Sequence, residues 1–395
     1  MDPPGLPTAA RGTECAERRD APTRSGGGPY TVIDRRNRAA VSCRKLRMPR
    51  LRRSDCAAPG ISRRRRGRGF EYRDPAGAKI DDPEVMERIA ELGIPPAWRE
   101  VWICMDPLGH LQATGIDAAG RKQYLYHPRW RSHRDRQKFD SMIAFGESLP
   151  SLRRQVARDL RPATPANGEL PATALSRQLV LGCAARLLDL GFFRIGSEDY
   201  AERNESYGLT TMLREHVTIE DGELVFDFPA KSGQRRVQAV ADPESLAVIA
   251  TLKRRRGAEQ LLAYRDGGRW RELHADEVNA YIKEATGGDF SAKNFRTWNA
   301  TVLAAVALAA RTGPRRSRGR PDRAVSAAIK TVAAYLGNTP AVARASYVDP
   351  RVIDRFKAGT TIAPALGAMN GGGPDLARPR VRRRIETAVL ELLAD

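Results

Sequence analysis

The chain has 395 residues, enough for two or three domains and at least one sizeable hydrophobic core. It carries 67 Lys and Arg residues against 47 Asp and Glu residues, a net charge of +20, which favours a polyanionic partner such as nucleic acid. The five Cys residues form no CxxC pair and no metal-ligand cluster with the five His residues, so we expect reduced thiols rather than disulfides. No apolar run reaches the length of a membrane span and no signal-peptide pattern opens the chain, so we expect a soluble intracellular protein.

Residues 1–68 are rich in Arg, Pro, Gly and Ser and show no sustained apolar period. They contain 18 basic and 6 acidic residues, and such a segment buries too little apolar surface to offset its ordering entropy. We therefore predict a disordered basic tail, in which the run RRRRGR (63–68) would bind phosphate backbones without reading sequence. A merely solvated tail, or an extension upstream of the true start, stays open as an alternative.

Residues 69–161 are predicted to form a small mixed domain of helix and sheet. Asp82 and Pro83 begin a short helix, which Gly93 ends. Residues 98–117 alternate between apolar and polar side chains around an Asp-Pro-Leu-Gly turn, a pattern typical of two strands.

Aromatic residues interleave with Arg and Lys over residues 120–140. This mixture suits contact with a nucleic-acid backbone and its bases, although a charged helix face with an aromatic anchor would produce the same pattern. The Pro- and Ala-containing stretch 162–173 is predicted to be a linker between two domains.

Residues 174–366 are predicted to form the second domain. An amphipathic helix ends at Gly191, and three short strands follow, joined by turns at Asp221-Gly222 and at Lys231-Ser232-Gly233. From Asp242 onward the pattern is helical, interrupted by a basic loop over 311–323. Residues 367–395 are predicted to be a C-terminal tail with a short helix.

A tyrosine near the end of the second domain is placed beside cations. Thr339 and Pro340 predict a helix start. Four apolar residues then recur at helical spacing and should face the core: Ala341, Ala345, Val348 and Val352. Arg344, Tyr347 and Arg351 fall on a different face, where the positive charge would favour the phenolate and attract an anion such as a phosphodiester.

Cleavage of a phosphodiester by tyrosine needs a nucleophile, donors for the charged phosphorus, an acid for the leaving alkoxide and a means of holding the strand. Arginine suits the donor role because its planar fork gives two hydrogen bonds and keeps its charge. Lysine suits the acid role because neighbouring cations lower its pKa. The chain shows no HExxH, acidic metal cluster or P-loop that would call for a metal or ATP.

Four segments, in their order along the chain, resemble the catalytic blocks of type IB DNA topoisomerases in their short bacterial and poxvirus-like form: FFRIG, the KSG hairpin, KNFRTWNAT and LGNTPAVARASYVDP. The resemblance runs from about Glu71 to Phe356. It implies an α+β protein, with a small mixed β/α N-terminal domain and a mainly α-helical catalytic domain that holds a small antiparallel three-stranded sheet, a catalytic fold shared with tyrosine recombinases. It also implies relaxation of supercoiled DNA by transient single-strand cleavage through a 3′-phosphotyrosyl intermediate, swivelling and religation, without ATP, metal or another cofactor.

The resemblance also assigns candidate catalytic residues. It implies that Tyr347 is the nucleophile, that Arg194 and Arg296 hold the scissile phosphate, and that Lys231 protonates the 5′ oxygen. Asn338 stands where many relatives have a histidine that donates to a phosphate oxygen. An amide can donate there too, but it carries no charge.

The resemblance implies contacts with double-stranded DNA from Gln123, Tyr124 and Tyr126 in the first domain and from Tyr200 in the second. Arg121, Lys122 and Lys293 are further DNA-binding candidates. We expect a monomer that clamps the duplex between its domains, with linker 162–173 as a hinge. We also expect a cytoplasmic, nucleoid-associated protein with no membrane partner. The tail before Phe70 and the basic loop 311–323 lie outside the family's usual pattern.

Two alternatives remain at this point. A tyrosine recombinase shares the fold and the Arg-Lys-Arg-Tyr chemistry, but recombinases generally carry a histidine three residues before the second arginine, where this chain has Lys293. A non-catalytic basic DNA-binding protein would also explain the net charge. It would give no reason for all four reactive positions to be filled.

Overall fold

The computed structural model describes residues 49–394 except 162–169, 199–200, 202–204, 258, 312–320, 368–375 and 377. Its first part is an antiparallel sheet in the order β2-β1-β3-β4-β5. The strands and the one helix associated with them are β1 (Ile61–Arg66), β2 (Gly69–Arg73), α1 (Pro83–Glu91), β3 (Arg99–Ile103), β4 (Leu111–Ile116) and β5 (Lys122–Tyr126). A small core lies between α1 and the sheet, formed by Ile61, Ile89, Val101, Ile103 and Ala113. Asp82 caps α1 as predicted, because its side chain accepts from two backbone N–H groups of the first turn.

The predicted disordered tail extends too far along the chain. Residues 61–66 form β1, which pairs with both β2 and β3, and Ile61 is buried in the small core. Arg63 donates to the carbonyl of Trp98 at 2.7 Å and lies 4.2 Å from the ring centroid of Phe70. The run RRRRGR is therefore a strand and its turn, ordered by cross-strand hydrogen bonds that its composition does not reveal. Residues 1–48 lie outside the described residues.

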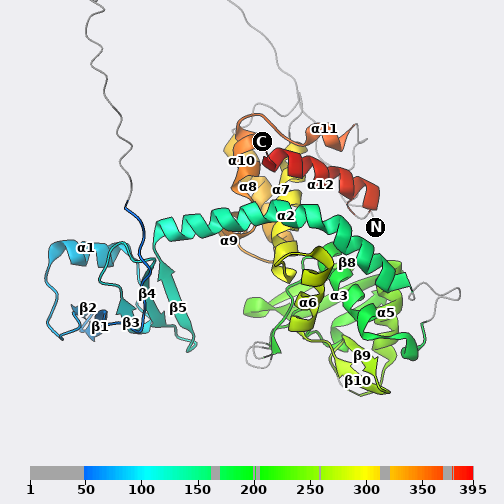
Figure 1. The fold of residues 1–395 in the computed structure, drawn as a ribbon, viewed down its shortest axis with the longest axis horizontal. Coiled ribbons are helices and arrows are strands. Elements are labelled where there is room, and N and C mark those ends of the chain that lie inside the picture. The colour runs from blue at the N-terminus through cyan, green and yellow to red at the C-terminus, as the bar shows by residue number, and fades with distance from the viewer. Residues whose placement is uncertain are drawn as a thin grey trace, which may run out of the picture. The chain divides into compact units, whose positions relative to one another are not determined.

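The second part of the structure begins within α2 (Pro128–Leu160), not at the predicted linker 162–173. From Met142 to Leu160, the apolar side chains of α2 belong to the same large hydrophobic core as α3 (Arg177–Leu190). The linker therefore joins two helices of one domain, and α2 itself connects the sheet to that domain (Figure 1). Most of the predicted linker lies outside the described residues, and 172–174 form a short 3₁₀ helix.

The large core is built mainly from helices, which Figure 1 shows around α7. They are α3, α5 (Pro243–Arg254), α6 (Ala275–Thr286), α7 (Ala292–Ala309), α8 (Pro321–Leu336), α9 (Pro340–Ser346), α10 (Pro350–Lys357), α11 (Ala363–Leu366) and α12 (Pro379–Ala394). Helix α7 is buried along most of its length, as its run of Ala, Val and Leu requires. None of the helices in the described residues is long and apolar enough to cross a membrane.

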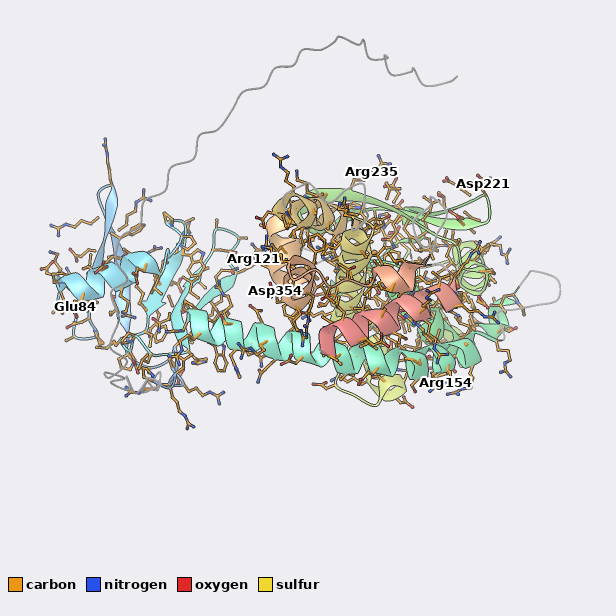
Figure 2. The ribbon with its side chains drawn as sticks, turned by 90° about the horizontal axis from the view of Figure 1, so that it is seen from above. Glu84, Arg121, Arg154, Asp221, Arg235 and Asp354 are labelled. Carbon is orange, nitrogen blue, oxygen red and sulfur yellow. The ribbon has the colours of Figure 1, made fainter. Side chains whose placement is uncertain are left out.

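The predicted three-stranded sheet is present, formed by β6 (Val217–Glu220), β7 (Glu223–Ala230) and β8 (Gln234–Val240). Asp221 and Gly222 both have positive φ, 48° and 80°, as a two-residue hairpin turn requires. The two labelled residues Asp221 and Arg235 mark opposite ends of this sheet in Figure 2, and Lys231 lies in the turn at the end near Arg235. These elements match the predicted α+β architecture.

The prediction of helix throughout from Asp242 onward is wrong at one place. Strands β9 (Ala263–Asp266) and β10 (Arg269–Glu272) form a second hairpin. Gly267 and Gly268 supply its turn with φ of 52° and 81°, backbone conformations that glycine adopts without steric cost. The predicted basic loop 311–323 lies mainly outside the described residues, and its last three residues begin α8.

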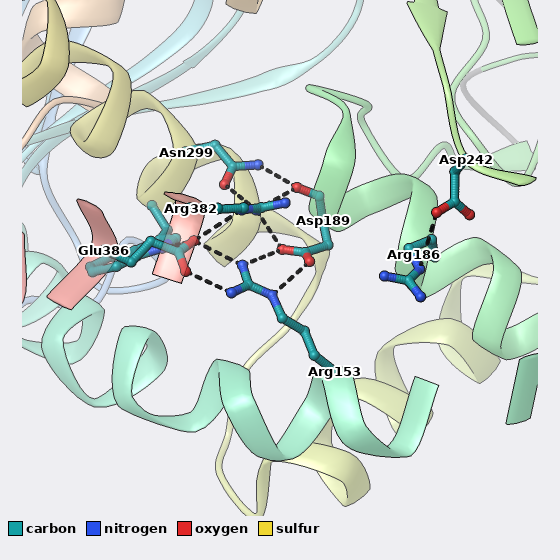
Figure 3. A network of polar contacts seen from close by, with 8 residues as sticks. Arg153, Arg186, Asp189, Asp242, Asn299, Arg382 and Glu386 are labelled. Carbon is teal, nitrogen blue, oxygen red and sulfur yellow. Dashed lines mark hydrogen bonds and ion pairs between the residues drawn. The ribbon is translucent and has the colours of Figure 1, made fainter. Parts of the chain in front are cut away.

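The C-terminal segment is not a tail, because α12 packs into the large core through a buried ionic network (Figure 3). Arg153 of α2 donates to Asp189 of α3 at 2.8 Å and to Glu386 of α12 at 2.6 Å. Arg382 donates to Asp189 at 2.7 Å, and the indole of Trp298 donates to Glu386 at 3.3 Å. Arg382 also donates to Glu386 at 3.1 Å, so both acids meet both arginines, which compensates the cost of burying four charges.

We expect Asp189→Asn to lower the free energy of unfolding in a pH-dependent manner. Burial opposes ionisation of Asp189, but Arg382 and Arg153 outweigh it and lower its pKa to about 2. A carboxyl whose pKa falls on folding stabilises the fold above its unfolded pKa of about 3.9 and loses that contribution as the pH falls toward 2. The loss should be about 2 kcal/mol near pH 7 and should shrink between pH 4 and 2 in urea unfolding.

The matched control is Asp354→Asn on the exposed surface of α10, labelled in Figure 2. It should change stability by no more than about 0.5 kcal/mol, as surface substitutions usually do. A loss at Asp189 that stayed constant from pH 7 to pH 2 would contradict the ionic role.

Candidate active site

Tyr347 lies in a pocket of about 530 Å³ whose walls come from α2, the segment after α3, the β7–β8 turn, α7 and α9. The cationic side chains that line it are Lys138, Arg194, Lys231, Lys293 and Arg296. No carboxylate is among its lining residues in the described part of the chain. The pocket therefore concentrates positive charge around one phenol.

The helix predicted around Tyr347 is interrupted at the tyrosine itself. Helix α9 ends at Ser346, and Tyr347 has φ −132° and ψ −27°, outside the helical range. Asp349 then caps a second helix, α10, by accepting from Arg351 N at 2.9 Å, and Pro350 occupies its first position. The residue before a proline is disfavoured in helical conformation, so the Asp349-Pro350 pair breaks the helix and leaves Tyr347 in the break.

This break changes which residues face the core and which face the tyrosine. Ala341 and Ala345 of the predicted apolar stripe are exposed, whereas Val348 and Val352 are buried. Neither of the two cations predicted beside Tyr347 is among the described residues that line its pocket. Arg351 pairs with Asp349 at 2.8 Å and with Asp140 at 3.2 Å, and Arg344 is exposed and is not among the described residues that line the tyrosine pocket.

Arg296 is the buried cation nearest the phenol. It extends from α7, is 4% exposed, and has its guanidinium carbon 5.3 Å from the centroid of the Tyr347 ring. Its Nη2 donates to the carbonyl of Leu336 at 2.9 Å, and its Nη1 donates to the carbonyl of Phe192. Two backbone carbonyls therefore fix its orientation and leave its charge uncompensated.

Arg194 and Asn338 form the second part of the site. Arg194 Nη2 donates to Asn338 Oδ1 at 2.9 Å. Asn338 directly follows α8, where Gly337 turns the chain with φ 61° and where a side chain would come within 2.9 Å of Arg236 Nη1. Glycine adopts this positive φ without steric cost, and the turn that it makes brings Asn338 next to Arg194.

Three buried donors in this region have no hydrogen-bond partner among the described residues: Asn338 Nδ2, Arg296 Nε and Arg236 Nε. An unpaired buried donor is costly, and the great majority of buried polar groups in proteins are paired. Unpaired donors beside uncompensated cations are chemically suited to an anion with several acceptor oxygens.

The charges alter the pKa values of the site in a consistent direction. Burial would raise the pKa of Tyr347, but the charges of Arg296 and Arg194 outweigh burial and hold it below its ordinary value. Burial and the repulsion of Arg194 lower the pKa of Arg296 to about 10, and the same two causes lower that of Arg236 to about 10. The site thus favours added negative charge, either as phenolate or as a bound anion.

The remaining predicted site residues in the second part of the structure are Lys231, Lys293 and Tyr200. Lys231 and Lys293 are exposed and line the pocket, Lys231 from the β7–β8 turn and Lys293 from the first turn of α7. Tyr200 lies outside the described residues. Sequence reasoning missed Lys138, which lines the pocket from α2, and Arg236 of β8, which lies behind Arg194. Lys138 stands in the segment 120–140 that mixes aromatic and basic residues, and Arg236 stands in the predicted three-stranded sheet, but nothing local distinguished either residue from its neighbours.

The predicted DNA-contact residues of the first part lie on β5, an edge strand. Lys122, Tyr124 and Tyr126 alternate along it and are exposed, and the two tyrosine rings stack with centroids 6.3 Å apart. Gln123 has the opposite orientation and donates to Asp117 at 2.9 Å. Arg121, labelled in Figure 2, pairs with the same carboxylate. Exposed stacked aromatics next to a lysine form a surface suited to nucleic acid.

Comparison with known proteins agrees with this geometry. Residues 127–360 match the family "Eukaryotic DNA topoisomerase I, catalytic core", and residues 69–117 match "Bacterial DNA topoisomerase IB, N-terminal domain". The chain is 31% identical to DNA topoisomerase 1B of Acanthamoeba polyphaga mimivirus over 294 residues, which is 70% of this chain and 84% of that protein.

More distant similarity extends to two further viral and eukaryotic proteins. DNA topoisomerase I of Monkeypox virus is 20% identical over 285 residues, 70% of this chain and 83% of that protein. DNA topoisomerase 1 of Schizosaccharomyces pombe is 26% identical over 176 residues, 44% of this chain and 19% of that protein. The matched families cover both parts of the structure, including the pocket around Tyr347, and the chain therefore belongs to the type IB DNA topoisomerases.

Proposed function

We propose that this chain relaxes supercoiled duplex DNA by transesterification at Tyr347. The phenol gives its proton to solvent and its oxygen attacks a backbone phosphorus, while the bond from that phosphorus to the 5′ oxygen breaks and the 5′ oxygen takes up a proton. The free 5′-hydroxyl end swivels and then attacks the phosphotyrosine to reseal the strand. One ester replaces another in each step, so the reaction itself requires no energy input from ATP.

The observation that carries this proposal is the group of buried, uncompensated donors around one phenol. Arg194 and Arg296 would each donate to the phosphate, and the unpaired Asn338 Nδ2 would supply a further donor. Charge accumulates on the non-bridging oxygens as the phosphorus becomes pentacoordinate, so these fixed donors bind the transition state more strongly than the ground state.

Lys231 would serve as the acid for the leaving 5′ oxygen. It lies in the turn between β7 and β8 and lines the pocket, so its flexible side chain can approach a bound strand. An alkoxide is a poor leaving group without a proton, which gives the lysine a role that a simple phosphate contact would not have.

We further propose that the protein acts as a monomer on double-stranded DNA, with the exposed tyrosines of β5 as a second contact surface. The net charge of +20 supports attraction to the DNA backbone, and a cytoplasmic, nucleoid-associated location would follow from such a substrate. Size-exclusion chromatography with light scattering would test the monomer.

Tyr347→Phe should abolish relaxation of supercoiled plasmid while leaving duplex binding nearly unchanged. The ring retains its packing, but the oxygen that attacks phosphorus is gone.

Wild type, incubated with chelator and without ATP, should relax both positive and negative supercoils and give a covalent adduct on denaturing gels. Tyr335→Phe, which removes a hydroxyl from an exposed tyrosine of α8, is the matched control and should behave as wild type. An adduct formed by Tyr347→Phe would show that another residue is the nucleophile.

Asn338→Asp should slow single-turnover cleavage by on the order of 10²-fold or more. The substitution keeps the oxygen that accepts from Arg194 but replaces the unpaired donor with a second, negatively charged oxygen. Asn279→Asp makes the same chemical change at a residue that is not among the described lining residues of the pocket. It keeps the oxygen that accepts from Ala292 N at 3.0 Å, and should leave the rate near wild type. Equal rates for the two variants would remove Asn338 from phosphate binding.

Lys231→Ala should slow cleavage of normal DNA strongly, yet cleave a strand with sulfur in place of the 5′ bridging oxygen at nearly the wild-type rate. A thiolate leaves without a proton, so the sulfur substrate bypasses the need for an acid. The comparison of the two substrates separates proton transfer from binding. If both substrates were slowed to the same extent, Lys231 would be a phosphate contact only.

A further inference from the structure

Lys138 is a pocket residue that extends from α2 to the segment carrying the tyrosine. Its Nζ donates to the carbonyl of Ser346 and lies 5.9 Å from the centroid of the Tyr347 ring. The same Nζ lies 4.6 Å from the Phe139 ring. A lysine more than two hundred residues away in sequence is thus in direct contact with the peptide that precedes the proposed nucleophile.

The carbonyl of Ser346 is one of the last in α9 and has no later N–H of its own helix to accept from. Lysines near a helix C-terminus bind such carbonyls and interact favourably with the negative end of the helix dipole. This carbonyl also belongs to the peptide joining Ser346 to Tyr347. The hydrogen bond from Lys138 therefore fixes the plane of that peptide, and with it the direction in which the tyrosine side chain leaves the backbone. Two other anchors hold the same residue: Tyr347 N donates to Ala343 O at 3.0 Å, and Thr301 Oγ1 donates to Tyr347 O at 3.3 Å.

We propose that Lys138 is a positioning residue for Tyr347, which holds the Ser346–Tyr347 peptide in place and keeps a cation beside the phenol. It would act through these contacts and not by touching the reacting phosphorus. The proposal rests on Tyr347 being the nucleophile.

The charged groups around Lys138 and Tyr347 support a cation that persists at the position of Lys138. Tyr347 faces Arg296 of α7 and Arg194 of the segment after α3, and Lys231 and Lys293 line the same pocket. Lys138 is acted on by Asp135 and Asp349, but it forms no ion pair with a described residue. Asp349 is already engaged by Arg351 at 2.8 Å. Burial lowers the pKa of Lys138, and the nearby carboxylates and Tyr347 oppose that effect.

A cation beside the phenol has a specific kinetic consequence. Cleavage and religation pass through the same transition state, in which the tyrosine oxygen carries partial negative charge. Lys138 would stabilise that charge in both directions, while the neutral phenol and the phosphotyrosyl ester gain much less from it. Loss of the cation should therefore slow both reactions by similar factors and leave their ratio nearly unchanged.

The test is single-turnover cleavage and religation from pH 6 to pH 10, at saturating duplex, for wild type, Lys138→Met and Lys138→Arg. Methionine keeps the apolar stem and loses the charge. We expect Lys138→Met to be roughly tenfold slower in both directions near pH 7, because losing about 1.4 kcal/mol of stabilisation from the shared transition state slows each direction tenfold. Its pH–rate profile for cleavage, the direction that starts from the free phenol, should shift to higher pH, and Lys138→Arg should recover most of the rate in both directions.

The matched control is Arg134→Met, which removes the same charge from an exposed position one turn earlier on α2. It should weaken DNA binding in a salt-dependent manner without moving the pH–rate profile. Lys138→Met rates within twofold of wild type at every pH, or a profile lowered in parallel without a shift, would overturn the proposal. Absence of any covalent adduct from wild type would instead refute the proposed function, so the two failures are distinguishable.

Discussion

The positive charge around Tyr347 is oriented by backbone carbonyls rather than by carboxylates, and the chemistry of the pocket depends on this arrangement. Arg296 donates to the carbonyl of Leu336, and Arg236 donates to that of Tyr335. A carbonyl orients a guanidinium without cancelling its charge, whereas a carboxylate would do both. Burial and the repulsion among these cations together lower the pKa values of Arg296 and Arg236, and the repulsion persists until an anion binds. A phosphate in the pocket would gain the attraction of the whole group, in surroundings where water screens it weakly.

Helix α7 fixes the distance between Arg296, the proposed phosphate-binding residue, and Tyr347, the proposed nucleophile. It carries Arg296, and little more than one turn later Thr301 Oγ1 donates to Tyr347 O at 3.3 Å and accepts from Asp349 N at 3.2 Å. One buried helix thus holds both the arginine and the break in which the tyrosine lies. The ionic network that docks α12 contacts α7 between these two residues, at Trp298. This network explains how a helix beyond the matched catalytic region stabilises the frame of the site.

Local signals in the sequence predicted most helices and strands. The features that sequence analysis missed depend on contacts between residues far apart in the chain. The turn at Asp221-Gly222 depends only on neighbouring residues and is present. Strand β1 was missed because its order comes from pairing with β2 and β3, which an arginine-rich composition does not reveal. The domain boundary was placed at 162–173 because composition marks a loop there but cannot show that both flanking helices share one core. The resembling segments located the pocket, yet Lys138 and Arg236 became evident only when the fold brought them beside residues that are 208 and 99 positions away.

Asn338 changes how the pocket depends on pH. An imidazole at this position would titrate near neutrality, so its donor strength and charge would vary across the physiological range. The amide donates at every pH and carries no charge. Its oxygen is committed to Arg194 at 2.9 Å, which directs its unpaired N–H group away from that arginine. In the proposed reaction, the charge of a bound phosphate is then met by the two arginines, and the pH response no longer includes an imidazole at this position.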